Sequence, residues 1–305
     1  MSTLETSPGI EADRDLRFRS VVFGTDFSDS SQVAGRYAAL FAAHFHCDCI
    51  VAHAFTLVQP ALEVEALEHV RSLQRKDLER LLSETLEDLA PLAGRAVTVL
   101  GEGSPIELLR ATSEHNRPSL VVLGTHGGGT LERHTLGSVA EEILRTIHGP
   151  VLTVGPHVAV PSSAVLAFRH ILYATDFSPA AADAAPYAMA LARSFGSEID
   201  VLHVVPDHAM GQPDDVTRQE QAFLSALHRL VPDQAADLCR SRTFVESGKV
   251  RERILEHASE GGIDLIVLGA HHHSWLARHL RTGPAFQIIL AAACPVLTTV
   301  APRRA

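Results

Sequence analysis

The sequence predicts an α/β protein of two tandem domains, each a doubly wound, open parallel sheet of five strands with helices on both faces. Three observations carry this prediction. Short apolar runs alternate with longer amphipathic stretches, which is the pattern of successive β-α-β units. The same series of elements occurs twice within 305 residues. In the first copy a glycine-rich loop joins a buried strand to a helix, as is typical of the carboxyl edge of a parallel sheet.

The internal repeat divides the chain. Residues 19–28 read RSVVFGTDFS, residues 169–178 read RHILYATDFS, and the correspondence continues to the apolar strands 150–154 and 295–300. The stretch between the copies contains prolines and two serines, which is typical of a linker. We therefore expect a disordered lead-in at 1–17, domains at 18–155 and 168–305, and a linker at 156–167.

The apolar periodicity places matching elements in the two copies. Right-handed crossovers between successive strands then make each copy a parallel sheet covered on both faces. Strands are expected at 49–54, 96–100 and 120–123 in the first copy and at 200–205, 242–245 and 265–268 in the second, with helices at 30–45, 62–89, 180–195 and 217–230.

Capping signals mark the starts of two helices. Ser104 is followed three residues later by Glu107, which predicts a capping box, and Pro105 fits the first helical position. In the second copy, Ser178 is the expected N-cap and Pro179 follows it.

The glycine-rich loop follows the fourth apolar strand of the first copy. Its spacing is Gly124, two residues, Gly127, nine residues and then Gly137, after which Ser138 and Glu141 predict another capping box. Free backbone N–H groups and the positive end of the helix dipole would attract a phosphate there. Glycine lets the backbone come close to such a ligand. A flexible turn is the alternative, but the setting between buried strand and capped helix favours an anion site.

Composition excludes several other classes of protein. The net charge of −10 argues against a general nucleic-acid surface or an anionic membrane as partner. No apolar run approaches the roughly 20 residues of a membrane span, and no signal-peptide core occurs near the N-terminus. The four cysteines form no CxxC pair and are read as idle thiols in a reducing compartment. We expect a cytoplasmic protein without a nucleic-acid or membrane partner.

Nearly the whole chain resembles the universal stress protein family in its tandem form. The resemblance rests on Thr25-Asp26-Phe27-Ser28, on His53-Ala54 and on the glycine spacing described above, which is typical of the ATP-binding branch. It implies a Rossmann-like sandwich with strand order 3-2-1-4-5 and an adenine nucleotide at the sheet edge. It also implies that the two domains pack through their fifth strands as an intramolecular pseudo-dimer. Further homodimerisation stays open.

The resemblance also implies positions for the parts of ATP. Asp26, with Gly24 beside it, would lie near the nucleoside, and Ala54 would line the adenine pocket. Leu123 and Gly124 would border the base or ribose. The other four residues, Gly127, Gly137, Ser138 and Val139, would lie against the phosphates. The full set is Gly24, Asp26, Ala54, Leu123, Gly124, Gly127, Gly137, Ser138 and Val139. Mg²⁺ is a candidate companion of ATP, and a protein partner of unknown identity would respond to the bound state.

The second copy departs from this pattern. Gly269 is kept, but His272 stands in place of Gly127, and Thr282 and Gly283 replace Gly137 and Ser138. The side chains of His272 and Thr282 would crowd a phosphate, and the hydroxyl of Ser138 has no counterpart at Gly283. We expect weak or no nucleotide binding there.

Three functions stay open from the sequence. The preferred one is an ATP-binding stress or regulatory protein without fast turnover. A slow ATPase or phosphotransferase would use His126, Arg133 and His134, although no Walker lysine follows the glycines. A nucleotide-free scaffold is the third. The histidines at 271–273 suggest a solvated loop more than a metal site, and the repeated His53 and His203 suggest a shared structural role.

Overall fold

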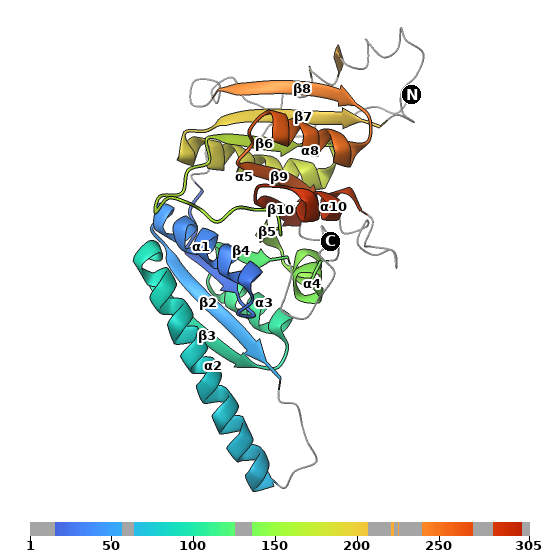
Figure 1. Ribbon diagram of the computed structural model, residues 1–305. Coiled ribbons are helices and arrows are strands. Elements are labelled where there is room, and N and C mark those ends of the chain that lie inside the picture. The colour runs from blue at the N-terminus through green and yellow to red at the C-terminus, as the bar shows by residue number, and fades with distance from the viewer. Residues whose placement is uncertain are drawn as a thin grey trace. The chain divides into compact units, whose positions relative to one another are not determined.

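The computed structural model describes residues 16–56, 64–125, 136–206, 221–222, 225, 240–270 and 283–300 (Figure 1). These residues form two compact units. The first unit comprises residues 17–167 together with 283–300, and the second comprises residues 168–270 together with Leu16. The closing helix and strand of the second sequence copy therefore belong to the first unit.

The first unit is built on a parallel sheet with the order predicted from the resemblance. Its strands run in the order β3-β2-β1-β4-β5, and each neighbouring pair is parallel. The central strands are buried on both faces, which explains their continuous apolar runs. The strands are β1 (Ser20–Gly24), β2 (Asp48–Phe55), β3 (Ala96–Glu102), β4 (Ser119–Gly124) and β5 (Gly149–Val154).

Helices cover both faces of this sheet, as predicted. Phe23 and Gly24 follow one another in β1 and so point to opposite faces. A Cβ on Gly35 of α1 would lie 2.9 Å from the Phe23 ring, so α1 covers the face of Phe23. A Cβ on Gly24 would meet Leu109 of α3, so α3 covers the opposite face. The helices are α1 (Asp29–His44), α2 (Val64–Ala93), α3 (Pro105–His115) and α4 (Ser138–Thr146).

Two of the three predicted helix starts are confirmed. The Ser104 hydroxyl accepts a hydrogen bond from the Glu107 N–H at 3.4 Å, with Pro105 at the start of α3. In the second unit, the Ser178 hydroxyl accepts from the Ala181 N–H at 3.2 Å. Both side chains satisfy an N–H group that the helix itself leaves unpaired.

The predicted capping box at Ser138 is wrong. Gly137 is the N-cap, with φ −61° and ψ 144°, and its carbonyl accepts from the Glu141 N–H at 2.9 Å. Ser138 is already the first helical residue, so its hydroxyl cannot occupy the capping position. No side chain caps α4.

The fifth strands of the two copies pair, as the resemblance implied. β10 (Val296–Val300) lies antiparallel to β5, with Leu297 opposite Leu152. The Thr153 hydroxyl donates to the Val296 carbonyl at 3.0 Å, and the Thr298 hydroxyl donates to the Val151 carbonyl at 3.4 Å. Equivalent residues of the two strands thus make reciprocal contacts, as at an isologous interface.

The second unit repeats the same parallel arrangement. Its strands follow the order β8-β7-β6-β9, which is 3-2-1-4 in the numbering of the copy. They are β6 (His170–Ala174), β7 (Glu198–Val205), β8 (Ser241–Ser247) and β9 (Leu265–Ala270), with helices α5 (Pro179–Phe195) and α8 (Val250–Glu260); α10 (Pro284–Ala291) lies in the first unit.

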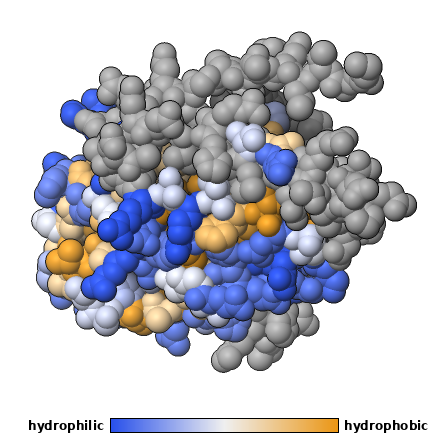
Figure 2. All heavy atoms as spheres, turned by 90° about the horizontal axis from the view of Figure 1, so that it is seen from above, coloured by the Kyte–Doolittle hydropathy of each residue, from blue (hydrophilic) through white to orange (hydrophobic). Residues whose placement is uncertain are grey.

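Hydrophilic residues cover most of the described surface in Figure 2, and the hydrophobic ones stand in small separate groups. The exposed large apolar side chains are likewise dispersed along the described chain, namely Val70, Leu73, Val97, Val160 and Val165. Scattered apolar residues of this kind are ordinary on protein surfaces. Among the described helices, none combines the length and apolar character needed to cross a membrane.

Candidate functional site

A pocket of about 330 Å³ lies at the carboxyl ends of β1, β2 and β4 in the first unit. In doubly wound sheets this edge is where ligands bind. The start of α3 and the first turn of α4 complete the walls. Eight of the nine positions named from the sequence line this one pocket: Gly24, Asp26, Ala54, Leu123, Gly124, Gly137, Ser138 and Val139. Gly127 lies outside the described residues.

Apolar side chains form the inner part of the pocket. A Cβ on Gly24 would lie 2.6 Å from Leu123 Cδ2 and 3.0 Å from Leu109 Cδ1. Glycine at the end of β1 therefore keeps this space open, because any side chain would press on the two leucines. Ala54 and Leu108 add further apolar surface. Such walls suit the flat face of a base.

The first turn of α4 forms the polar end of the pocket. Ser138, Val139 and Ala140 line it, and their N–H groups belong to the set that a helix leaves without internal acceptors. Gly137 donates its own N–H to the Thr125 carbonyl at 2.8 Å, so it is not a donor to a ligand. Because no side chain caps α4, the positive end of the helix dipole and the N–H groups of Ser138, Val139 and Ala140 face the pocket.

Asp26 sits in a turn that both copies share. Its Oδ1 accepts from the Ser28 N–H at 3.1 Å, and the Thr25 hydroxyl accepts from the Phe27 N–H at 3.0 Å. The second copy has the same bonds at Asp176 and Thr175. Asp26 is therefore held in place by a local turn at the exposed rim of the pocket.

The central phenylalanine of this turn has a left-handed backbone in both copies, with φ 63° at Phe27 and φ 59° at Phe177. Such angles are unusual for a bulky residue. Each ring packs against a histidine, with centroids 4.5 Å apart for His53 and 4.6 Å apart for His203. Sequence reasoning missed this strained turn, and the repetition of the four-residue motif was its only signal.

The shared structural role expected for the two histidines is confirmed. Nδ1 of His53 lies 2.7 Å from the Thr25 carbonyl oxygen, and Nδ1 of His203 lies 2.8 Å from that of Thr175. Each ring therefore donates to the turn after the first strand of its copy. Burial lowers the pKa of His203, which favours the neutral ring. His53 also lines the pocket, although it was not among the predicted contacts.

Gly124 has a packing role that the sequence did not reveal. A Cβ there would lie 3.1 Å from the Ser30 carbonyl oxygen and 3.2 Å from the Ser31 nitrogen, at the start of α1. In the second unit, a Cβ on Gly269 would come within 2.2 Å of the Ala180 carbonyl carbon. Glycine in this position lets the fourth strand pass close to the first helix.

We expect Gly124→Ala to lower the free energy of unfolding by roughly 1–3 kcal/mol, because the added methyl meets backbone that cannot move aside freely. Gly24→Ala is the matched control, since its methyl would meet only the ends of leucine side chains. Urea unfolding of both variants measures the difference. Equal losses in the two variants would contradict the packing role.

The second copy keeps the glycine that caps the helix but loses the N–H donor at the first helical position. Gly283 is the N-cap of α10, with φ −66° and ψ 145°, so it corresponds to Gly137 and not to Ser138 as the sequence comparison suggested. Pro284 then takes the first helical position, where it has no N–H to offer an anion. This loss is compatible with the expected weak binding.

Several residues weighed from the sequence lie outside the described part of the chain. These are His126, Arg133 and His134 of the glycine loop, and His271, His272, His273 and Thr282 of the second copy. Within the described part, no three histidine, cysteine or acidic side chains gather as metal ligands would.

The fold and the pocket define a tandem doubly wound α/β protein with a crevice at the carboxyl edge of its first sheet. Residues 17–155 and 167–299 each match the Universal stress protein family. The chain belongs to this family.

Individual relatives agree with this assignment. A universal stress protein of Methanocaldococcus jannaschii is 29% identical over 140 residues, which is 45% of this chain and 82% of the relative. One of Mycobacterium bovis is 30% identical over 190 residues, covering 60% of this chain and 62% of the relative. The solved structure of a universal stress protein from Archaeoglobus fulgidus has a TM-score of 0.68 at 19% identity, over 94% of this chain and 97% of that one. This structural likeness shows the fold.

Proposed function

We propose that the first unit binds ATP and that the protein acts as a nucleotide-dependent regulator in a stress response. One observation carries the proposal: eight of the nine residues named from the sequence line a single pocket with an apolar inner wall and an uncapped helix N-terminus. The two ends of this pocket suit the two ends of a nucleotide.

The residues present fit a triphosphate better than a neutral ligand. The N–H groups of the first turn of α4 and the Ser138 hydroxyl would hold phosphate oxygens, while Ala54 and Leu123 would face the base. Asp26 is the single acidic side chain that lines the described pocket. Mg²⁺ usually takes most of its ligands from phosphates and water, so one carboxylate is compatible with an ATP–Mg²⁺ complex.

We expect the natively purified full-length protein to carry ATP, or to bind it with a stoichiometry of one per chain. Native mass spectrometry and calorimetry measure this, with cAMP tested in parallel. The stoichiometry follows from the loss of the N–H donor at Pro284 in the second copy. A protein that neither carries nor binds adenine nucleotides would favour the scaffold function, and two equivalent sites would overturn the asymmetry.

A further inference from the structure

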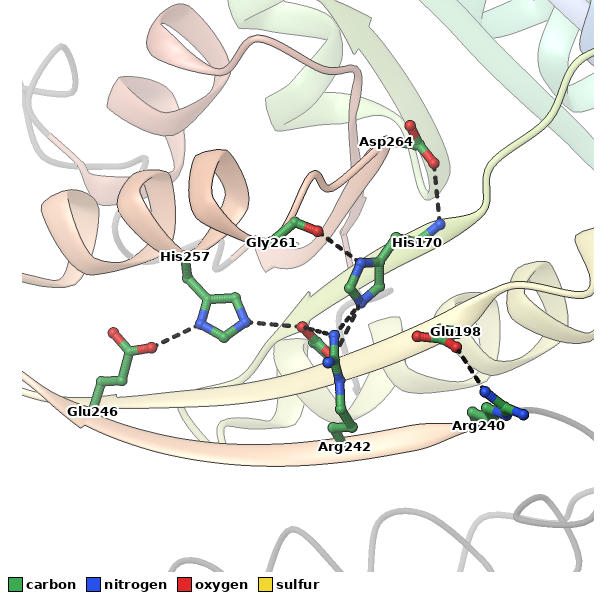
Figure 3. A network of polar contacts seen from close by, with 9 residues as sticks. His170, Glu198, Arg240, Arg242, Glu246, His257, Gly261 and Asp264 are labelled. Atoms are coloured by element: carbon green, nitrogen blue, oxygen red, sulfur yellow. Dashed lines mark hydrogen bonds and ion pairs between the residues drawn. The ribbon is translucent and has the colours of Figure 1, made fainter.

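A buried ionic cluster lies in the second unit, between α8 and the sheet (Figure 3). Its centre is Asp200 of β7, whose side chain is 2% exposed. The first unit has an apolar pair at the same place, because Ile50 pairs with Val97 in register where Asp200 pairs with Arg242. The cluster is thus a property of the second copy alone.

Arg242 neutralises one side of Asp200. Its Nε lies 2.9 Å from Oδ1 and its Nη2 lies 3.2 Å from Oδ2 of the carboxylate. The guanidinium also stands 5.7 Å from the centroid of the Phe244 ring. Two donors from one planar group fix the position of the carboxylate.

His170 of β6 contacts both Arg242 and Asp200. Its Nε2 lies 2.8 Å from Nη2 of Arg242, and a guanidinium can only donate, so Nε2 must accept. The proton then resides on Nδ1, which lies 2.9 Å from the Gly261 carbonyl oxygen at the end of α8. Nε2 also lies 3.2 Å from Asp200 Oδ1.

His257 of α8 faces a carboxylate with each ring nitrogen. Nδ1 lies 2.7 Å from Glu246 Oε1, and Nε2 lies 3.0 Å from Asp200 Oδ2 (Figure 3). A neutral imidazole has one proton and can donate to only one of them. The geometry therefore requires the imidazolium form, which balances two carboxylates against His257 and Arg242. The side chain of His257 is 10% exposed, so water cannot readily replace either partner.

We propose that His257 is a proton-controlled clamp that holds α8 on β7 and β8, closed in mildly acidic solution and loosened in alkaline solution. Loss of the proton leaves a ring lone pair facing a carboxylate and one unbalanced negative charge within the cluster. α8 corresponds to α3, which forms a wall of the pocket in the first unit. The clamp thus controls the equivalent helix of the second copy.

The direction of the pH dependence follows from both ends of the contact. The hydrogen bond to Asp200, opposed by burial and supported by Glu246, raises the pKa of His257 above its ordinary 6.5. The stability that protonated His257 contributes is therefore complete below pH 6.5 and is lost as the pH rises through the raised pKa of His257. Burial acts to raise the pKa of Asp200, but bonds from His257 and Arg242 lower it from 3.8 to about 2. The stability that ionised Asp200 contributes is present above pH 3.8 and is lost as the pH falls toward 2.

The other charged groups around His257 leave this direction unchanged. Arg242 of β8 and His170 of β6 reach the ring only through Asp200. On α8 itself, Arg253 pairs with Glu256, and their side chains are 39% and 51% exposed. The clamp is therefore closed between about pH 4 and the raised pKa of His257.

Hydrogen exchange of the α8 amides in the full-length protein tests the clamp. Between about pH 6 and about pH 8.5, protection corrected for intrinsic exchange should fall roughly tenfold or more, as for loss of one charge-assisted hydrogen bond. His257→Gln should abolish this change. Glu246→Gln should move its midpoint to lower pH, because the ring loses an anionic partner.

His115→Gln is the matched control, since it replaces an exposed histidine in the last turn of α3, the counterpart of α8. It should leave the exchange of α8 as in the parent protein. Protection of α8 that is independent of pH in the parent would overturn the proposal. An unchanged midpoint in Glu246→Gln would also overturn it, because that result is expected if Glu246 only packs against His257 and does not affect its proton.

Discussion

Gly137→Asp is expected to abolish ATP binding while the protein stays as stable as the parent or becomes slightly more stable. Gly137 is the N-cap of α4, in an extended conformation that any residue can adopt. Aspartate is among the best N-cap residues, so its carboxylate would accept from the first-turn N–H groups and complement the helix dipole. The same carboxylate would occupy the place proposed for phosphate and repel it.

Calorimetric titration with ATP and thermal unfolding together measure this effect. We expect affinity to fall by about a hundredfold or more, with a change in stability of no more than about 1 kcal/mol. Gly283→Asp makes the same change at the N-cap of α10 and is the matched control, which should leave ATP affinity unchanged. Undiminished binding by Gly137→Asp would place the phosphates elsewhere. Loss in both variants would indicate that α10 contributes to the site.

Arg242→Met is expected to destabilise the second unit strongly. It removes the charge that faces Asp200 but keeps the apolar stem of the side chain. Breaking a buried ion pair costs about 3–5 kcal/mol, and we expect about 2–3 kcal/mol because Arg242 is itself half exposed. Chemical denaturation near neutral pH measures the loss.

The first unit suggests a compensating variant. Ile50 and Val97 hold the positions of Asp200 and Arg242 in the strands of the first unit. Thr112 holds the position of His257, because the two residues occupy the same place in the eleven-residue helices α3 and α8. The combined change Asp200→Ile, Arg242→Val and His257→Thr should restore stability to the parent level or above, since apolar packing often replaces a buried ion pair without loss. If Arg242→Met alone were neutral, the guanidinium would contribute nothing to holding Asp200.

Local signals in the sequence were sufficient for most of the fold. Continuous apolar runs identified the buried strands, and the N-caps Ser104 and Ser178 were correct because their hydroxyls need only a neighbouring N–H. The start of α4 was misplaced by one residue, since Gly137 and Ser138 are both acceptable N-caps. The choice is made by the Gly137 N–H, which donates to Thr125 across the glycine loop.

Contacts between distant segments were beyond the sequence. Asp200 meets Arg242 across 42 positions and His257 across 57, so the cluster depends on strand register and on the seat of α8. The approach of Gly124 to Ser30 likewise depends on how close α1 lies to the sheet. The pocket itself was predictable, because parallel strands bring their carboxyl ends to one edge whatever the side chains between them.

The pairing of β5 with β10 also bears on how the chain folds during synthesis. Thr153 and Val296 are 143 positions apart, and residues 168–270 of the second unit are made between them. Until β10 emerges, β5 has an open edge of unpaired backbone groups, which other chains can join. The unit with the proposed nucleotide pocket is therefore begun first and completed last. Ribosome-bound intermediates carry the vulnerable edge throughout that interval.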